Sequence, residues 1–486
     1  MRVVLFALNG SYAHTCLALR CLRRPLEEAG FEVLLIEKNL RDRRDEVLQA
    51  LYGVRADIYS FSCYIWNIEE ALVLAEDLSA LLPGAKIIFG GPEVSFETER
   101  FLSCSFVDAF VCGEGEDTVA ELCERVRQGE EIPRVVHGKA LDVMREDGIL
   151  YREGDYKAGE LLYYESSRGC PYRCAYCLSS VGGALRAKPA ETVLADMEEF
   201  EMLSSQIKVI KFVDRTFNFD VDRANAVWRG LLKGKFTKNY HFEICASLLN
   251  EESFAILEQF PKGKIQLEIG LQSTNPETLA AVARHLSPER VIEATKRIYG
   301  MGNIHVHLDL IAGLPFEGYA RFAQSFNDAY FCSDMLQLGF LKLLHGTALR
   351  RDAEKYGYVC MAKAPYTVLE TKWLSRDELY RLSKIADLLD RFYSSGRFAL
   401  SLDFAVRYAP SPFAFYEGLL DYISATDGRE IRQLSQTDAF RAFYGYAASF
   451  LAGGLLAEFE EKLHADYAAH EARKMPRSVV FGKDQG

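Results

Sequence analysis

The stretch "ESSRGCPYRCAYCLSS", residues 165–180, places three cysteines, Cys170, Cys174 and Cys177, within eight residues. A structural zinc site takes four ligands, usually as two C-x2-C pairs or one such pair with histidines. No histidine or second cysteine pair stands nearby, and the next cysteine along the chain is Cys245. Iron–sulfur clusters also normally take four cysteines, but three are sufficient when one iron of a [4Fe–4S] cube keeps an open position. The triplet therefore predicts a metal centre with one open position, with zinc as the alternative.

The composition is that of an ordinary globular protein. The chain has 486 residues, enough for roughly two to four domains, with 49% apolar and 26% charged residues. The net charge of −12 argues against a surface for nucleic acid, and the longest apolar runs are much shorter than a membrane span. The first apolar run, residues 3–8, is broken by Asn9-Gly10, so we interpret it as a buried strand rather than a signal segment. We expect a cytoplasmic protein that binds neither nucleic acid nor a membrane, with its other cysteines mostly buried as small residues.

Residues 1–130 alternate apolar, β-rich runs with amphipathic helical stretches. Continuous apolar strands separated by helices predict an α/β fold with a doubly wound, Rossmann-like parallel sheet. In such a sheet, ligands bind beyond the carboxyl ends of the strands. Two of the loops expected there, residues 90–95 and 113–117, are rich in glycine, which lets the backbone approach a ligand closely. The predicted strands are residues 2–9, 32–39, 56–64, 85–91 and 106–113.

A polar, turn-rich segment at 131–160 is predicted to be a linker, and the alternation of strands and helices resumes over 161–349. Strand candidates separated by enough residues for a helix predict a partial (β/α)6 barrel, whose chemistry belongs to the loops after the strands. The cysteine triplet directly follows the first of these strands. Residues 350–486 are predicted to form a mainly helical C-terminal domain. The barrel strands are expected at 161–166, 207–214, 240–247, 265–273, 304–313 and 335–344.

In this position, "CPYRCAYC" (170–177) resembles the C-x3-C-x-aromatic-C signature of the radical S-adenosylmethionine (radical SAM) enzymes. In that family the three cysteines hold a [4Fe–4S] cluster, and the open iron chelates the amino and carboxylate groups of S-adenosylmethionine (SAM). The segments "EIGLQSTNPETL" (268–279) and "HLDLIAGLPFEG" (307–318) resemble the family's fourth- and fifth-strand segments. The residues that the resemblance assigns to SAM are Tyr176, Glu243, Gln272, Gly313 and Pro315.

Two positions depart from the family's pattern. "FVDRTFN" has Arg215 where relatives have an aspartate, and "HFEICASLL" has Cys245 where relatives often have an arginine near the cofactor. For Glu243 and Gln272, the alternative role is that of hydrogen-bonded, inward-facing residues in a layer of the barrel. His345, after the sixth strand, is a further candidate, although a neutral structural histidine is the more common role for such a residue.

The first domain resembles the cobalamin-binding domains that precede some radical SAM barrels. The resemblance rests on "FGGPEVSF" (89–96) and "VCGEGEDT" (111–118), whereas no G-x-G-x-x-G turn for a dinucleotide follows the first strand. The D-x-H-x-x-G motif that supplies a histidine to cobalt is missing, and we expect His14 to be a polar loop residue. The resemblance then implies cobalamin bound without a protein histidine. Tyr64 and Trp66 are candidates for packing on its lower face, with core or interface packing as the alternative. The implied cobalamin-binding residues are Tyr64, Trp66, Gly90, Gly91, Pro92, Glu93, Gly113, Glu114 and Gly115.

The resemblance implies an enzyme that cleaves SAM reductively to a 5′-deoxyadenosyl radical and methylates an unactivated carbon, with cobalamin carrying the methyl group. The substrate is expected to be a small molecule or a peptide, and the electron donor a flavodoxin or a ferredoxin. No catalytic side chain is singled out by the sequence. The alternatives are a cobalamin-dependent rearrangement or cyclisation without methyl transfer, a methylthiotransferase and, in a different class, a cofactor-sensing protein whose cluster has no catalytic role.

Overall fold

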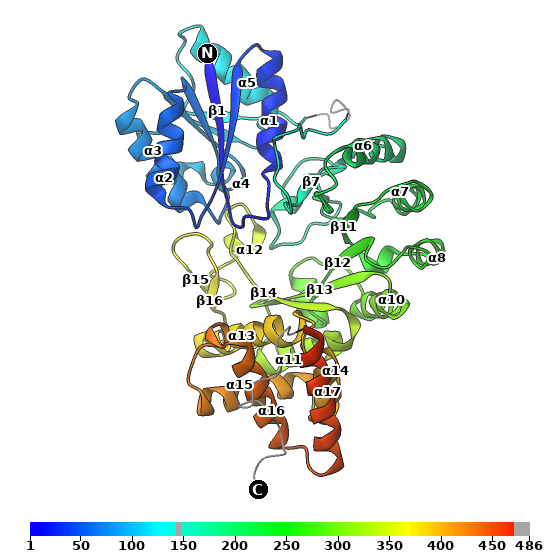
Figure 1. The fold of residues 1–486 in the computed structure, drawn as a ribbon. Coiled ribbons are helices and arrows are strands. Elements are labelled where there is room, and N and C mark those ends of the chain that lie inside the picture. The colour runs from blue at the N-terminus through cyan, green and yellow to red at the C-terminus, as the bar shows by residue number, and fades with distance from the viewer. Residues whose placement is uncertain (142–147, 471–486) are drawn as a thin grey trace.

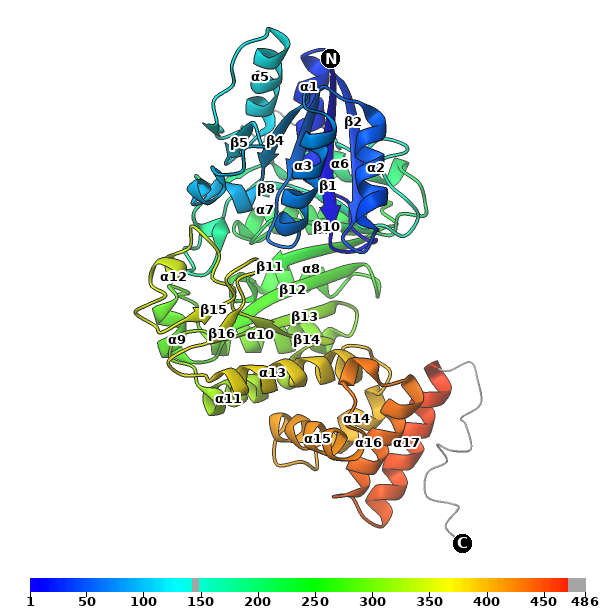
Figure 2. The ribbon, with the colours of Figure 1, turned by 90° about the vertical axis from the view of Figure 1, so that its left-hand side faces the viewer.

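The chain folds into a first α/β sheet, a second parallel sheet with its own helices, and a helical C-terminal part (Figure 1, Figure 2). The computed structural model describes residues 1–141 and 148–470. The predicted linker at 131–160 and the predicted C-terminal domain at 350–486 therefore lie partly outside the described residues. Within the described ranges, no helix is both long enough and apolar enough to cross a membrane.

The first sheet is parallel, with the strand order β2-β1-β3-β4-β5-β6. Its strands are apolar because helices cover both faces: α1 (Leu17–Glu28) and α5 (Glu116–Arg127) on one side, α2 (Arg44–Val54) and α3 (Ile68–Leu81) on the other. This confirms the doubly wound sheet. The last strand, β6, lies in the segment that was predicted to be a linker. The strands are β1 Arg2–Asn9, β2 Glu32–Asn39, β3 Ile58–Ser62, β4 Lys86–Gly90, β5 Ala109–Cys112 and β6 Val135–His137.

The second sheet is also parallel, and its order β14-β13-β12-β11-β10-β7 follows the chain from one edge to the other. The strands β7 and β14 stay at opposite edges, so the barrel is open, and helices lie along one face of the sheet (Figure 1). This confirms the partial β/α barrel. Its strands are β7 Leu162–Tyr164, β10 Val209–Phe212, β11 Asn239–Ile244, β12 Ile265–Gln272, β13 His305–Ala312 and β14 Met335–Phe340. The helices on that face are α6 Ala190–Met202, α7 Val221–Lys233, α8 Glu251–Leu257, α10 Pro288–Met301 and α11 Tyr319–Ala329.

The alternation of side chains along β12 separates the two faces of the barrel sheet. Ile265, Leu267, Ile269 and Leu271 are buried and belong to the core formed with the helices. The residues between them, such as Glu268, point to the opposite face and are partly exposed. Polar residues therefore line the inner face of the barrel, where a cofactor or substrate can bind.

The C-terminal part consists mainly of helices that pack on the end of the barrel near α11, as predicted. Phe326 of α11 contacts the ring of Phe413 at 5.3 Å, and the hydroxyls of Tyr330 and Tyr416 lie 2.8 Å apart. The same hydrophobic core continues from the barrel strands into these helices. They are α13 Arg376–Leu388, α14 Ala399–Val406, α15 Pro412–Thr426, α16 Gln436–Ala448 and α17 Gly454–His470.

The first sheet contacts the barrel beside both of its edge strands. Near β7, His14 forms a parallel bridge with Leu161. Near β14, His345 Nδ1 lies 2.6 Å from Glu97 Oε2, which contributes to holding the loop after β14 on the first domain. The carboxyl ends of the first sheet are thus placed against the barrel.

Candidate active site

The three predicted cluster cysteines lie in one loop that follows β7 and the short strand β8 (Ser167–Arg168). The main chain of this loop is fixed on two sides, because Ala175 N donates to Val282 O and Ala175 O accepts from Leu349 N, both at 2.9 Å. Ser180 Oγ also donates to the carbonyls of Cys177, at 2.6 Å, and Cys174, at 3.1 Å. The backbone that carries the thiols is therefore held before any metal binds.

The protonation of the Cys170 thiol depends on its burial and on the other two cysteines of the loop. Burial raises the pKa of the Cys170 thiol, and the charges of Cys177 and Cys174 raise it further. Across residues 1–141 and 148–470, no three His, Cys, Asp or Glu side chains lie close enough together to bind one metal ion. A four-iron cube binds each cysteine at a different iron, so its ligands are spaced more widely than those of zinc. The donor set of this loop, three cysteines, is the one expected for a cube with one open iron.

Arg284 is a residue at this loop that the sequence did not single out. Its Nη1 lies 3.7 Å from Cys174 Sγ and 3.4 Å from the hydroxyl of Tyr176, while Nη2 donates to Gly270 O. Its Nε is buried without a partner. A Cβ on Gly270 would lie 2.3 Å from the side-chain amide nitrogen of Gln272 and 3.2 Å from Arg284 Nη2, so both side chains pack closely over this glycine. The guanidinium of Arg284 thus lies beside the cluster loop, and its unpartnered Nε is a donor that a ligand could use.

The inner face of the barrel carries a network of charged side chains. Lys211 Nζ lies 3.0 Å and His241 Nε2 3.1 Å from Glu268 Oε2. The contacts with His241 and Lys211 lower the pKa of Glu268 to about 2, although its burial opposes the shift. Burial, followed by the charges of Glu268 and Glu243, raises the pKa of Asp309 to about 8. At neutral pH, therefore, Glu268 is ionised and Asp309 carries a proton.

The residues predicted to bind SAM gather at the carboxyl ends of neighbouring barrel strands. Tyr176 lies beside Arg284, and Glu243 and Gln272 project from the inner faces of β11 and β12. Gln272 has a φ of 72°, and its Oε1 is buried without a partner. Gly313, with a φ of 95°, directly follows β13. The carbonyl of Pro315 is occupied, because it accepts a hydrogen bond of 2.8 Å from Thr278 of α9 (Pro276–Ala281).

Most of the residues predicted to bind cobalamin line one cavity of about 220 Å³ at the carboxyl ends of the first sheet. Arg168 lines it too, and pairs with Glu114 at 3.0 Å and with Glu116 at 2.8 Å. Because Arg168 is two residues before Cys170, the cavity and the cysteine loop are adjacent. The predicted residues in this lining are Tyr64, Gly90, Gly91, Gly113, Glu114 and Gly115.

Three predicted cobalamin residues are not part of that lining. Trp66 is half-exposed and stacks on Tyr64 with 4.3 Å between ring centroids. Pro92 begins the short helix α4 (Pro92–Ser95). Glu93 is buried, accepts a hydrogen bond from the Tyr366 hydroxyl and pairs with Arg100. Its carboxylate therefore joins two parts of the chain.

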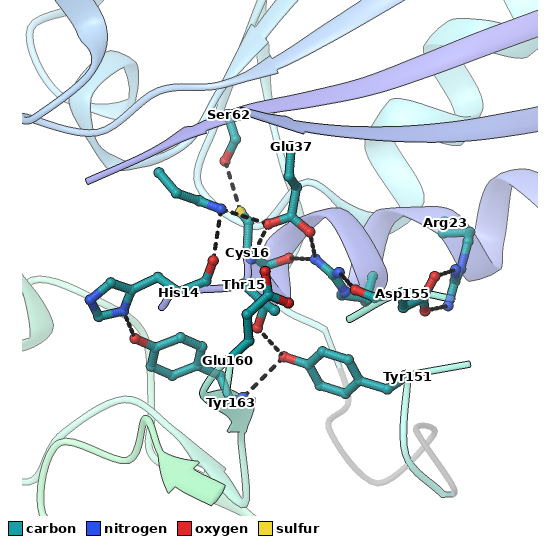
Figure 3. A network of polar contacts seen from close by, with 12 residues as sticks. His14, Thr15, Cys16, Arg23, Glu37, Ser62, Tyr151, Asp155, Glu160 and Tyr163 are labelled. Carbon is teal, nitrogen blue, oxygen red and sulfur yellow. Dashed lines mark hydrogen bonds and ion pairs between the residues drawn. The ribbon is translucent and has the colours of Figure 1, made fainter. Parts of the chain in front are cut away.

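A larger cavity of about 490 Å³ lies at the carboxyl ends of β1 and β2, against residues 154–160, and none of the predicted cofactor residues lines it. Figure 3 shows the adjoining polar network, in which Arg23 holds Asp155 through two contacts of 2.8 Å. The ring of His14 points to Tyr163, and its Nδ1 contacts the hydroxyl of Tyr163 (Figure 3). Burial and the charge of Lys211 lower the pKa of His14. His14 thus joins the two domains, which agrees with its expected role as a polar loop residue.

Three family models match successive parts of the chain. The "B12 binding domain" matches residues 4–123, the "Radical SAM superfamily" matches residues 164–329, and a family described as "Protein of unknown function (DUF4080)" matches residues 354–485. The first match covers the two glycine-rich loops, and the second covers the cysteine loop and the barrel strands β10 to β13. The cofactors of these two domains are cobalamin and a [4Fe–4S] cluster with SAM.

Curated relatives match parts of this chain at low identity. The chain is 27% identical over 310 residues to a 2-(S-pantetheinyl)-carbapenam-3-carboxylate methyltransferase from Streptantibioticus cattleyicolor, covering 55% of this chain and 44% of the relative. It is 24% identical over 435 residues to the cobalamin-dependent radical SAM methyltransferase TokK from Streptomyces tokunonensis, covering 76% of this chain and 62% of the relative. The alignments thus span roughly half of each relative's own length.

A solved structure has the same fold over nearly the whole chain. The cobalamin-dependent SAM radical enzyme OxsB, with aqua-cobalamin bound, superposes with a TM-score of 0.64 at 14% identity, over 96% of this chain and 79% of that one. This likeness extends through the helical C-terminal part. With a B12-binding domain, a three-cysteine loop on a partial barrel and helices after it, the chain belongs to the radical SAM enzymes that carry a cobalamin-binding domain.

Proposed function

We propose that this enzyme cleaves SAM reductively and transfers a methyl group, by way of cobalamin, to an unactivated carbon of a small-molecule or peptide substrate. The observation that carries the proposal is that Arg168 lines the glycine-rich cavity two residues before Cys170, so the two cofactor sites adjoin. The bound cofactors supply the radical and the methyl group, while the protein orients them and excludes competing reactions. The methyltransferase relatives support this reaction.

In the proposed site, Cys170, Cys174 and Cys177 hold the cluster through their thiolates. Arg284 supports the binding of the SAM carboxylate, because its guanidinium lies beside Cys174 with one donor unpartnered. Four predicted residues complete the proposed SAM site around the ring of Tyr176 and the open end of the barrel. They are Glu243, Gln272, Gly313 and Pro315.

For cobalamin, we propose that the cavity lined by Tyr64 and the two glycine-rich loops holds the cofactor, with the exposed part of Trp66 packing on it. Glu93 and Pro92 then act indirectly, by fixing the loop that contains Gly90 and Gly91. We place the domain boundaries near residues 138, 160 and 349, because β6 (Val135–His137) belongs to the first sheet rather than to the predicted linker.

The proposed electron donor is a flavodoxin or a ferredoxin, since a reductive cleavage needs a source of single electrons. We propose a cytoplasmic location. It is supported by the twelve cysteines, none of which forms a disulfide bond in the structure, as is usual in a reducing compartment.

Anaerobic reconstitution with iron and sulfide tests the proposal. We expect about four irons per chain, as in one cube, and 5′-deoxyadenosine after reduction in the presence of SAM. Cys174→Ala should lose both, whereas Cys104→Ala, a partly exposed cysteine of the first domain, should keep both. Equal iron content and equal SAM cleavage in Cys174→Ala and the parent protein would contradict the cluster assignment.

The cobalamin part is tested separately, by the visible spectrum of protein expressed with hydroxocobalamin. We expect bound corrinoid in the parent protein and an at least tenfold weaker affinity in Gly115→Leu, whose side chain would enter the cavity. Protein without corrinoid or affinity for it would contradict methyl transfer by cobalamin. Detection of a methylated product, rather than a rearranged or methylthiolated one, distinguishes the proposed reaction from the alternatives.

A further inference from the structure

Arg215 is a cation that points into the open barrel. It lies in the turn after β10, and its guanidinium contacts Glu243, which projects from the inner face of β11. Its neighbours Asp214 and Thr216 are buried, yet 59% of the Arg215 side chain is exposed. The guanidinium is therefore accessible inside the barrel, at the strand end that carries the active-site loops.

The contact that Arg215 makes is weak for a guanidinium. Its Nη1 lies 3.5 Å from Glu243 Oε2. By comparison, Arg23 holds both oxygens of Asp155 at 2.8 Å. An arginine has five N–H donors in a planar fork that matches a carboxylate or a phosphate. A single long contact thus leaves most of this fork available to a ligand.

The other cations of the inner face, Lys211 and Arg284, form closer contacts with the protein than Arg215 does. Lys211 contacts Glu268 at 3.0 Å, and Arg284 contacts Gly270 O and the cluster loop. The hydroxyl of Thr216, the next residue, lies 3.8 Å from Cys170 Sγ, which places Arg215 beside the cysteine loop. Desolvation opposes the charge of Arg215, but the charges of Glu243 and Cys177 raise its pKa overall. Arg215 is thus close to the site of radical formation and is not needed to hold the cluster loop.

We propose that Arg215 recognises an anionic group, a carboxylate or a phosphate, on the substrate that receives the methyl group. The proposal rests on the function proposed above and narrows its substrate to an anionic molecule. A guanidinium at the end of β10 holds the anion by two parallel charge-assisted hydrogen bonds. The carbon skeleton attached to that anion then lies in the barrel beside the cluster loop.

The test uses the reconstituted holoenzyme with cobalamin and SAM bound, and inorganic phosphate as the probe. Phosphate is titrated while the electron paramagnetic resonance spectrum of the reduced cluster is recorded, in the parent protein, Arg215→Gln, Arg215→Lys and Arg407→Gln. Arg407 is a matched control, since it is 61% exposed and pairs with Asp403 on the surface of α14. The dissociation constant of SAM is measured in the same variants.

We expect phosphate to change the spectrum of the parent protein and of Arg407→Gln with equal affinity. Arg215→Gln should bind phosphate at least tenfold more weakly, because it loses charge-assisted hydrogen bonds, and Arg215→Lys should lie between them. The dissociation constant of SAM should change by less than threefold in Arg215→Gln.

Three results overturn the proposal: no effect of phosphate on the parent protein, unchanged phosphate affinity in Arg215→Gln, or competition between phosphate and SAM together with a tenfold loss of SAM affinity in that variant. The last would assign Arg215 to the carboxylate of SAM instead. Failure of the proposed function is a different result, because it appears in the parent protein as missing corrinoid or missing 5′-deoxyadenosine, regardless of residue 215.

Discussion

Asp309 should make the barrel less stable as the pH rises, and Asp309→Asn should remove this effect. The pKa of Asp309 is raised from 3.8 to about 8, first by burial and then by Glu268 and Glu243. Between these values the unfolded chain has lost the proton and the folded chain keeps it, so the free energy of unfolding falls as pH rises. One pKa unit corresponds to about 1.4 kcal/mol, so a shift of about four units can lower the free energy of unfolding by at most about 6 kcal/mol at pH 8. Because Asp309 is partly accessible to solvent, we expect the free energy of unfolding to fall by about 2–3 kcal/mol.

The measurement is urea denaturation of the apoprotein from pH 5 to pH 8, with hydrogen exchange of the β13 amides to locate the change. Asp309→Asn should have nearly the stability of the parent protein at pH 5 and exceed it at pH 8. Asp403→Asn, at an exposed carboxylate of α14 paired with Arg407, is the control and should follow the parent curve. Parallel curves for Asp309→Asn and the parent protein between pH 5 and pH 8 would refute a protonated Asp309.

Three further substitutions test the first domain. Gly91→Ala should lower the free energy of unfolding in urea by about 2–4 kcal/mol, because φ is 107° and a Cβ would lie 2.6 Å from a backbone carbonyl oxygen. Gly90→Ala is the control: its Cβ would meet no atom closer than 3.9 Å, and the substitution should be nearly neutral. Glu37→Gln should lower the free energy of unfolding by about 3–5 kcal/mol in the same assay, because the Arg20 side chain is 1% exposed and loses its ion-pair partner. A decrease of less than about 1 kcal/mol would contradict this. Tyr366→Phe should lower the thermal midpoint through a loss of about 1–3 kcal/mol in the free energy of unfolding, since the buried carboxylate of Glu93 loses one of its donors and keeps Arg100 at 3.3 Å. An unchanged midpoint would contradict this.

The sheets could be predicted because their strands carry a local pattern. β12 alternates buried and accessible residues, and β1 is a continuous apolar run, so each pattern indicates how many faces are covered. β6 was missed for a physical reason. It has three residues, Val135–His137, and becomes a strand only by pairing with the edge strand β5, which no local periodicity reveals.

The candidate site could be predicted where a short motif carries it, as in the cysteine loop and the two glycine-rich loops. Arg284 could not be found in this way, since it is 110 residues from Cys174 and reaches it only in the folded chain. The raised pKa of Asp309 depends on its burial in the folded barrel and then on Glu268, which belongs to the neighbouring strand. Glu93 lies in a predicted motif, but its side chain is occupied by Tyr366, far along the chain. Long-range contacts of this kind leave no trace in local spacing.

The segment after the barrel links the loops of the two cofactor domains. The hydroxyl of Tyr358 donates to Gly313 O at 3.0 Å, at the end of β13, while the hydroxyl of Tyr366 donates to the buried Glu93 of the glycine-rich loop. Both tyrosines belong to residues 354–485, which match neither the B12-binding nor the radical SAM model. This short segment therefore contacts both loops, in addition to the ion pairs that Arg168 forms with Glu114 and Glu116. The C-terminal region therefore contributes to the spacing of the two cofactor loops as well as to the core of the barrel.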